Sequence, residues 1–316
     1  MRARVCFPGA PAARGSGRTP KAIRVRLSDQ MGKGTLSREG RVINRDLRLG
    51  SAVSDYREFL PTLPLAGYLL CLWTQTVTGS RDEFEQRVLP DGCVDIVLIN
   101  DEAPIVVGPW TEPFVARLAP GTIIVGARCH PGLAPGLLRL PASALLNQLV
   151  PLRDVWSSSV TAQFERIADE ADIVARRSAI EAALLNRIAH AAPVDETVSA
   201  AIRWLARYPQ GRIEQLGRWI GLSCRQLQRR FTAAVGYGPK LFQCVLRFQR
   251  LLNLANNVGV QGSFAQFAVE AEYADQAHMT REVQRFSGEP PSISLQSPRC
   301  ALRLSGLIRT EHSLGS

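Results

Sequence analysis

Two arginines and a glutamine in the C-terminal half of the chain have types and spacing suited to reading DNA. Arg225, Gln228 and Arg229 stand at positions i, i+3 and i+4, so a helix would carry all three on one face. Arginine can make two hydrogen bonds to a guanine edge in the major groove, and glutamine can make two to an adenine edge. These residues therefore predict a surface that contacts base pairs.

The segment around these residues has the sequence features of a helix–turn–helix. Leu227 and Phe231 recur one turn apart and can face a small apolar core. Gly221 lies between two helical runs, where a left-handed backbone is least costly for glycine. Ser223 and Gln226 fit a capping box at the start of the second helix. The spacing predicts that the reading face is carried by a helix beginning just after Ser223.

The end of that helix and the local charge support the same interpretation. Gly236 suits the left-handed position that follows a helix, and Pro239 suits the first turn of the next one. Between Arg203 and Arg250 the chain has ten basic residues and one acidic residue, Glu214. A basic run alone would fit a solvated helix face. Combined with the helix–turn–helix pattern and the polar side chains, it favours nucleic acid as the partner.

A second copy of the pattern follows between Phe264 and Pro291. Phe267-Ala268 corresponds to Leu216-Gly217, and the segment from Gly288 corresponds to the one from Gly236. Asp275 takes the N-cap position of the second reading helix. Its polar candidates are Gln276, His278, Thr280 and Arg281.

These two segments resemble the AraC/XylS family of bacterial transcription regulators over roughly residues 195 to 293. The motifs that carry the resemblance are GLSCRQLQRRF, GYGPK and RFQR, followed by YADQAHMTREVQRFSGEPP. The resemblance implies two helix–turn–helix units joined by one helix, here about Pro239–Asn256, with the two reading helices in successive major grooves. The candidate DNA-binding residues are Arg225, Gln228, Arg229, Arg230, Gln276, His278, Thr280 and Arg281. Double-stranded DNA and RNA polymerase, which the bound protein would recruit or block, are the implied partners.

Two residues depart from the family pattern in the second unit. Glu272 stands where the family usually has glycine, and a left-handed residue with a side chain is strained by about 1 kcal/mol or more. Val283 stands where the family favours phenylalanine. We therefore expect the second unit to be the weaker reader, and Glu272→Gly to stabilise it.

Residues 51–156 are predicted to form a β-rich regulatory or sensor domain. Short runs rich in β-branched and aromatic residues alternate with turn signals, as in a small sandwich or barrel. The runs are Leu69–Val77, Phe84–Leu89, Val94–Asn100, Ile105–Val107, Phe114–Leu118 and Thr122–Ala127. A short helix is predicted over Pro141–Leu149. The segment also resembles the N-terminal domain of some AraC-type regulators through LPDGCVDIVL, VVGPWTEPF and ARCHPGLAPGLLRLPAS, followed by VPLRDVW, which implies a small-molecule effector as a candidate partner.

The remaining segments have simpler predictions. Residues 157–192 read as two helices that either pack on the β-rich domain or form a homodimer, and 193–293 as the DNA-binding domain. Residues 294–316 are predicted to be a flexible tail. Residues 1–50 have twelve basic and three acidic residues and no sustained period. They are interpreted as a disordered extension, or as the result of a start codon placed too early, with Met31 as a plausible true start. A basic arm along DNA phosphates is the alternative.

The fold class predicted is therefore α+β, a β-rich N-terminal domain followed by an all-α domain of two helix–turn–helix units. Seven cysteines without a C-x-x-C pair provide no zinc spacing, and no cofactor is expected. The sequence has no nucleophile–base motif and no long apolar run, so we expect neither an enzyme nor a membrane protein. We expect a cytoplasmic protein associated with the nucleoid. The alternative is an Ada-like alkylation-responsive or redox-responsive regulator with a reactive cysteine, for which Cys93 is the candidate.

Overall fold

The computed structural model describes most of the chain after residue 51 and three short strands before it. The described residues are 3–5, 23–25, 45–49, 52–79, 83–258 and 263–295. Strands β1 (Ala3–Val5) and β2 (Ile23–Val25) pair antiparallel. The predictions of a disordered extension, a basic arm and a flexible tail otherwise fall outside the described residues.

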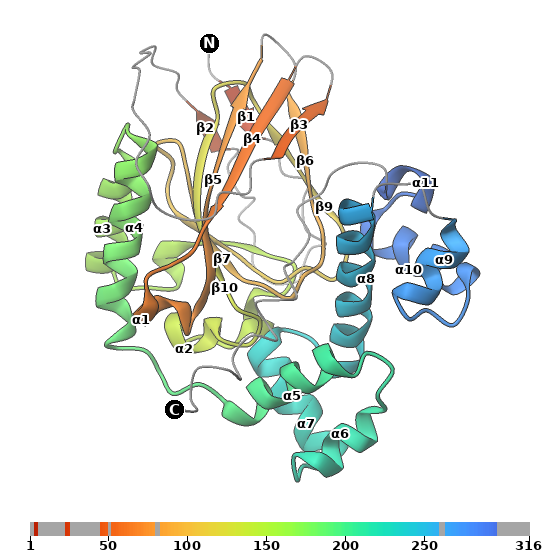
Figure 1. The fold of residues 1–316 in the computed structure, drawn as a ribbon. Helices are drawn as coiled ribbons and strands as arrows, with labels where there is room; N and C mark the ends of the chain where they lie inside the picture. The colour runs from red at the N-terminus through yellow and green to blue at the C-terminus, as the bar shows by residue number, and fades with distance from the viewer. Residues whose placement is uncertain are drawn as a thin grey trace, which may run out of the picture.

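A seven-stranded antiparallel sheet forms the centre of the N-terminal half (Figure 1). Its strands in order are β11 (Leu149–Pro151), β8 (Ile105–Val107), β7 (Asp95–Ile99), β10 (Ile123–Cys129), β5 (Leu69–Thr78), β4 (Ala52–Phe59) and β3 (Arg45–Leu49). A separate ribbon pairs β6 (Phe84–Val88) with β9 (Phe114–Leu118). The six predicted strands are confirmed as β5 to β10, whereas β4, with its polar sequence AVSDYREF, was missed.

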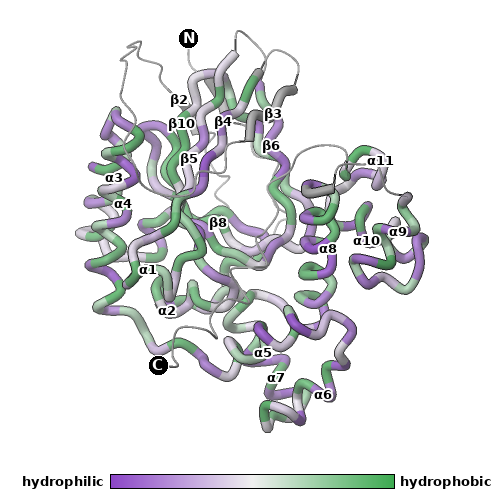
Figure 2. Tube along the Cα trace, viewed as in Figure 1, coloured by the Kyte–Doolittle hydropathy of each residue, from purple (hydrophilic) through white to green (hydrophobic). Residues whose placement is uncertain are grey.

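Alternate residues of the central strands face opposite sides of the sheet, so two apolar cores form. On β7, Ile96 and Leu98 pack against the helices, and Val97 and Ile99 face the β6–β9 ribbon. Figure 2 shows long hydrophobic stretches in the central strands, whereas α3 and α4 carry hydrophilic residues at intervals along their length. A sheet buried on both faces explains why these strands read as nearly continuous apolar runs.

Helices cover one face of the sheet. Helix α4 (Ile173–Ile188) packs on β5 and β10, and α3 (Ser158–Ala168) packs on α4. Their buried residues, such as Phe164 and Leu184, belong to the core beneath the sheet. The smaller elements here are α1 (Leu63–Ala66), α2 (Ala134–Leu138), η1 (Ala142–Leu145) and η2 (Leu152–Asp154). The two predicted helices are present and pack on the sheet; dimerisation through them stays a prediction.

The single helix predicted over Pro141–Leu149 is wrong. Only Ala142–Leu145 is helical, as one 3-10 turn, and Leu149 already belongs to β11, which pairs with β8. Between them, Asn147 adopts a left-handed backbone with φ 54°, and its side-chain oxygen accepts a hydrogen bond from the Thr111 amide at 2.8 Å. Long-range strand pairing thus overrides the local helical preference.

From residue 196 to 295 the described residues form helices and their connections. The helices are α5 (Glu196–Arg207), α6 (Ile213–Trp219), α7 (Cys224–Val235), α8 (Pro239–Val258), α9 (Phe264–Glu270), α10 (Gln276–Ser287) and α11 (Pro291–Ser294). Helices α6 and α7 form one helix–turn–helix unit, α9 and α10 form the other, and α8 joins them (Figure 1). The predicted α+β fold class is confirmed, with α8 running two residues beyond its predicted end.

The helical half docks on the β-rich half through α8. Leu89 and Cys93, which flank a turn between β6 and β7, are buried in the helical core. The Gln249 side chain donates a buried hydrogen bond to the Pro90 carbonyl at 2.6 Å. Gly92 has φ 80°, and a Cβ there would lie 2.7 Å from the Phe242 ring, so this turn requires glycine for close packing.

In the part of the chain that the structure describes, no helix combines the length and the apolar character needed to cross a membrane.

Candidate nucleic-acid interface

Helix α7 is fixed at both ends by local features that the sequence predicts. Gly221 in the preceding turn has φ 71°, and Gly236 after the helix has φ 100°. The Ser223 hydroxyl accepts a hydrogen bond from the Gln226 amide at 3.3 Å, and the Gln226 side chain accepts one from the Ser223 amide at 3.0 Å. The predicted capping box is therefore confirmed, and it sets where the helix begins.

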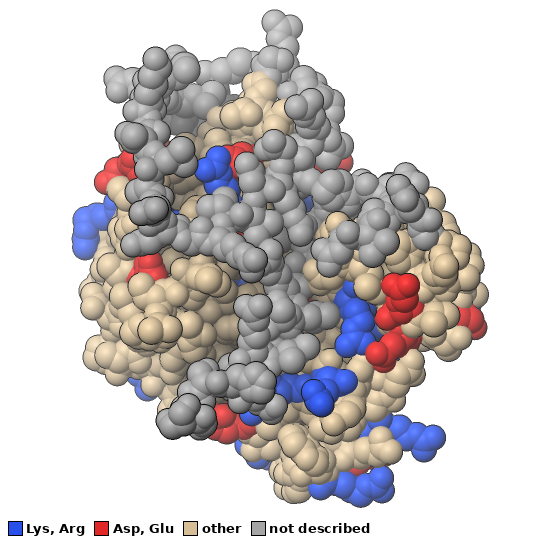
Figure 3. Space-filling model, in the orientation of Figure 1, with Lys and Arg blue, Asp and Glu red and all other residues tan. Residues whose placement is uncertain are grey.

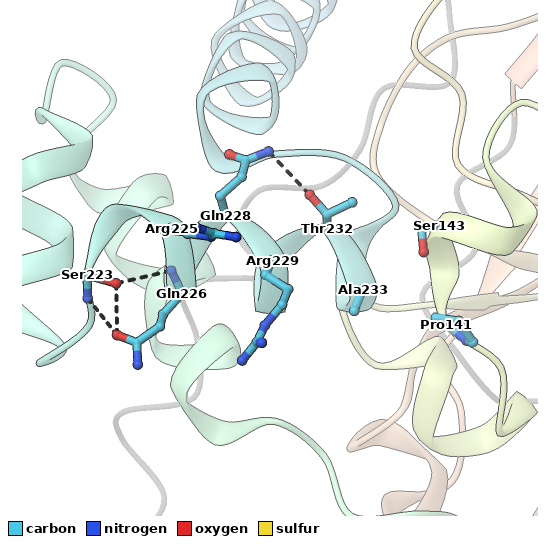
Figure 4. A pocket seen from close by; sticks show the side chains of 9 residues that line it. All are labelled: Pro141, Ser143, Ser223, Arg225, Gln226, Gln228, Arg229, Thr232 and Ala233. Carbon is cyan, nitrogen blue, oxygen red and sulfur yellow. Dashed lines mark hydrogen bonds between the residues drawn. The ribbon is translucent and has the colours of Figure 1, made fainter.

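The exposed face of α7 brings together the three residues predicted to read bases. Arg225, Gln228 and Arg229 are exposed, whereas Leu227 and Phe231 on the opposite face are fully buried. Figure 4 shows the three polar side chains leaving the helix between the capped end and the η1 segment. The burial of one face thus holds the other face outward in a defined orientation.

This face borders a shallow hollow of about 960 Å³. The η1 segment contributes Ser143 to its lining, together with the preceding Pro141, and the first unit contributes Ser223, Arg225, Gln226, Gln228, Arg229, Thr232 and Ala233. The Gln228 side chain donates a hydrogen bond to the Thr232 hydroxyl at 3.3 Å. The proximity of Ser143 to α7 depends on domain docking, so no local sequence signal could have revealed it.

Arg230 does not belong to this face, in contrast to its place among the predicted DNA-binding residues. Its guanidinium donates hydrogen bonds to the Asp195 carboxylate at 2.6 and 2.8 Å and to the Thr197 hydroxyl at 3.1 Å. Asp195 also caps α5 by accepting a hydrogen bond from the Val198 amide. Hydrogen bonding to Arg230 lowers the pKa of Asp195. Arg230 therefore connects α7 to α5.

The second reading helix, α10, presents fewer of its predicted residues. Gln276 and Arg281 are exposed, and the Asp275 carboxylate accepts a hydrogen bond from the His278 amide, which confirms the predicted N-cap. The Thr280 hydroxyl donates to the Gln276 carbonyl at 2.9 Å, within the same helix.

His278 is half-buried, and its ring lies against Tyr273 and Glu282. Its ring meets Tyr273 edge-on at a centroid distance of 5.3 Å, and its Nε2 lies 3.7 Å from the Glu282 carboxylate. Counting from the two N-caps, His278 is the counterpart of Gln226, a capping position. By the same count, Thr280 and Arg281 are the counterparts of Gln228 and Arg229. Exposed Gln284 is the counterpart of Thr232, and the sequence analysis missed Gln284 as a candidate.

The turn of the second unit has the strained backbone expected at Glu272, and Glu272 also makes contacts that the sequence analysis did not predict. Glu272 has φ 61°, in the left-handed region. Its carboxylate accepts a hydrogen bond from the Arg250 guanidinium at 2.8 Å, and its carbonyl accepts one from the Gln210 side chain at 2.7 Å. The expected stabilisation by Glu272→Gly stays a prediction, and the substitution would also remove this ion pair.

The two units differ in charge. The first unit and its flanking helix have exposed Glu196 and Glu214 and a larger set of exposed arginines: Arg203, Arg207, Arg212, Arg218, Arg225 and Arg229. On α9, α10 and their turn, exposed Arg281 and Arg285 are balanced by exposed Glu270 and Asp275. Figure 3 shows basic side chains gathered over α5 and α6 at the lower right of the view. The first unit thus offers the stronger attraction for a polyanion.

Of the described cysteines, Cys71, Cys93 and Cys129 are buried, Cys244 is half-buried and Cys224 is exposed. Cys93, the candidate sensor, is buried, and burial raises its pKa well above the ordinary value. Burial also raises the pKa of Cys244 to about 11. Both thiols are therefore protonated at neutral pH, so neither has the thiolate form that reacts. Within the same described ranges, no group of three or more His, Cys, Asp or Glu side chains could hold a metal ion.

One family model matches part of the β-rich half. A family model described as a domain of unknown function (DUF6597) matches residues 57–151. No curated protein matches the chain.

Among solved structures, ToxT from Vibrio cholerae in its P21 form is similar with a TM-score of 0.37 and 10% identity, covering 78% of this chain and 98% of that chain. Wild-type ToxT from Vibrio cholerae strain SCE256 with an unsaturated fatty acid bound has a TM-score of 0.36 and 12% identity, covering 79% of this chain and 96% of that chain. Because both scores are low, the function of this chain has to follow from its own residues.

Proposed function

We propose that the chain is a sequence-specific DNA-binding transcription regulator of the AraC type. The observation that carries this proposal is the exposed face of α7, where Arg225, Gln228 and Arg229 project from a capped helix whose other face is buried. Arg230 of α7 forms an ion pair with Asp195. The guanidinium groups of Arg225 and Arg229 are exposed and can contact bases or phosphates. In this reading α7 enters the major groove and supplies base contacts.

The second unit would dock in the next major groove on the same side of the duplex. Helix α8 has 20 residues and therefore spans about 30 Å. One turn of DNA spans roughly 34 Å, so a rod of this length can separate two reading helices by about one turn. Thr280, Arg281 and Gln284 are the α10 residues best placed to contact bases, because they repeat the register of the α7 face.

The rest of the chain would regulate this contact. We assign residues 193–293 to DNA binding, 51–156 to a regulatory domain and 157–192 to a helical connector. RNA polymerase is the proposed downstream partner, recruited or blocked at the bound site, with a small-molecule effector and a second copy of the chain as candidate partners. Such a regulator, which needs no catalytic residues, would act in the bacterial cytoplasm on nucleoid DNA.

The proposal can be tested by selecting DNA from a pool of random duplexes with the purified full-length chain and sequencing the retained fragments. We expect one enriched motif with two half-sites about 10 base pairs apart, centre to centre. Sequencing that finds no motif above the starting pool would refute sequence-specific binding.

A matched pair of variants separates base reading from general charge. Arg225→Ala with Arg229→Ala should erase the enriched half-site of the first unit. Arg203→Ala with Arg207→Ala removes the same charge from the exposed side of α5 and should weaken binding without changing the motif. If the Arg225→Ala with Arg229→Ala variant instead bound more weakly but kept the same motif, the α7 arginines would be assigned to phosphates.

A further inference from the structure

The turn of the second helix–turn–helix unit keeps a strained residue where the first unit has glycine. Glu272 follows the last turn of α9 with φ 61°, just as Gly221 follows α6 with φ 71°. Gly221 adopts this backbone without steric penalty, but a residue with a Cβ does not. A strained residue persists where the surrounding structure holds it, so the contacts of Glu272 indicate what this turn does.

Those contacts reach outside the second unit. The Arg250 side chain on α8 donates to the Glu272 carboxylate at 2.8 Å and to the Ala206 carbonyl, at the end of α5, at 3.2 Å. The Gln210 side chain, in the connection between α5 and α6, donates to the Glu272 carbonyl at 2.7 Å. Glu272 is thus tied at once to the joining helix and to the connection that leads into the first unit. Figure 3 shows basic and acidic side chains lying against each other where α8 meets the second unit.

Other contacts of the second unit serve a different purpose. The Arg247 guanidinium on α8 pairs with the Glu282 carboxylate of α10 at 2.7 Å, and both side chains are largely buried. Phe248 packs on Phe286 with ring centroids 5.4 Å apart. These contacts hold α10 on α8 but do not touch α5 or α6. The Glu272 contacts differ because they link the two units to each other.

We propose that Glu272, through Arg250 and Gln210, fixes the position of the second reading helix relative to the first and so sets the half-site spacing that the protein accepts. The inference rests on the proposed docking of both units on one duplex. Asp275, the N-cap of α10, lies three residues after Glu272, so a shift of this turn moves the beginning of the reading helix. Glu272 is a positioning residue that makes no contact with DNA itself.

The test uses the full-length chain and three kinds of duplex: the selected operator, the half-site of the first unit alone, and the operator with one or two base pairs inserted between half-sites. Glu272→Gly should leave half-site affinity within about twofold. It should lower operator affinity about tenfold, which corresponds to about 1.4 kcal/mol, and largely remove the preference for the native spacing over the inserted ones.

Three further variants identify the cause. Glu272→Gln keeps an oxygen that can accept from Arg250 and should retain most of the spacing preference. Gln210→Ala removes the contact from the side of the first unit and should broaden the accepted spacings as Glu272→Gly does. Glu270→Gln removes a neighbouring exposed negative charge and should keep the native preference.

The outcomes separate the inference from the proposed function. Wild-type protein that binds the half-site and the operator equally would refute docking of two units, and the positioning role with it. The positioning role alone would be overturned by a different result. In that case the wild-type protein prefers the operator at its native spacing, and Glu272→Gly and Gln210→Ala both keep this preference. Thermal melts of each variant show that it is folded, and a change in melting temperature with intact spacing preference would likewise count against the inference.

Discussion

At the scale of single residues, neighbouring arginines of α7 have opposite tasks. Arg229 is exposed on the reading face, whereas Arg230, one residue later, is bound to Asp195 and Thr197. A helix turns by about 100° per residue, and this rotation carries Arg230 from the reading face to the side of α7 that packs on α5. The position of each arginine around the helix, rather than its residue type, therefore determines whether it can meet DNA.

Arg229→Ala is predicted to weaken binding to the selected operator by about 1–3 kcal/mol and to relax the preference at one base pair. The physical reason is the loss of two hydrogen bonds to a base edge from an exposed guanidinium. Competition binding against operators substituted at each base pair measures both effects. An equal loss of affinity for operator and random DNA would show instead that Arg229 contacts a phosphate.

Arg230→Gln is predicted to lower the melting temperature at pH 7 and to leave the salt dependence of DNA binding unchanged. The pair with Asp195 is partly exposed, so its loss should amount to no more than about 1 kcal/mol. Because Arg230 lowers the pKa of Asp195, the pair stabilises the fold above the ordinary aspartate pKa of about 3.9 and loses this effect as pH falls through the lower folded-state pKa.

Thermal melts at pH 7 and at successively lower pH values test this sign. The difference between wild type and Arg230→Gln should shrink below about pH 4. A shallower slope of log K against log salt in the variant would restore Arg230 to the DNA contacts.

At the scale of elements, the sequence predicts best what is local. The start of α7 at Ser223, its end at Gly236 and the start of α8 at Pro239 all depend on residues within one turn, and the structure confirms each. His278 lies one helical turn from Glu282 on α10, but its contact with Tyr273, in the turn before that helix, depends on how the turn packs.

The contacts that the sequence analysis missed join residues far apart in the chain. Gln210 and Glu272 are 62 positions apart, and Arg230 and Asp195 are 35 positions apart. Neither pair leaves a periodic signal, because only the packing of α5, α8 and the second unit brings the partners together. The strain at Glu272 was predictable from one turn, but its ion pair with Arg250 was not.

The packing of α10 on α8 depends on one ion pair within an apolar contact. Arg247 and Glu282 have side-chain exposures of 9% and 11%, so removing one partner would leave a charge poorly solvated. Arg247→Met is therefore predicted to destabilise the helical half by about 3–5 kcal/mol. Denaturant unfolding followed by circular dichroism measures the loss.

The double variant Arg247→Met with Glu282→Leu supplies the control. Replacing both charges with apolar side chains removes the unpaired carboxylate, so most of the lost stability should return. If the double variant were as unstable as Arg247→Met alone, the ion pair itself, rather than the orphaned charge, would hold the two helices together.

At the scale of the whole molecule, the β-rich half touches the first unit, the joining helix and the second unit. Pro109 and Ala142 lie against Gly236, and Gln249 bonds to the Pro90 carbonyl. Arg87 donates to the Ser287 carbonyl at 3.0 Å and pairs with the adjacent Glu289 at 2.9 Å. The β6–β7 region thus contacts α8 and the end of α10, whereas α7 contacts the η1 segment of the same half.

The distribution of charge over the whole chain bears on the N-terminal arm. The net charge is +10, and residues 1–50 alone hold twelve basic and three acidic residues. A basic arm could add phosphate contacts to those of the helix–turn–helix units, and each contact would steepen the slope of log K against log salt by about 0.9. The strength of binding at low salt would then depend on the arm as much as on α7.

Removal of residues 1–30 is predicted to leave folding and operator affinity almost unchanged. The deletion takes away seven basic residues and one acidic residue, together with the short strands β1 and β2, which pair with each other. Exposed arginines of the first unit are sufficient for several phosphate contacts, so the salt slope should persist. Operator affinity of both chains, measured from low to moderate salt, tests this expectation. A fall of about two units or more in the slope of the shortened chain would place the arm along the DNA backbone, because only lost phosphate contacts change that slope so strongly.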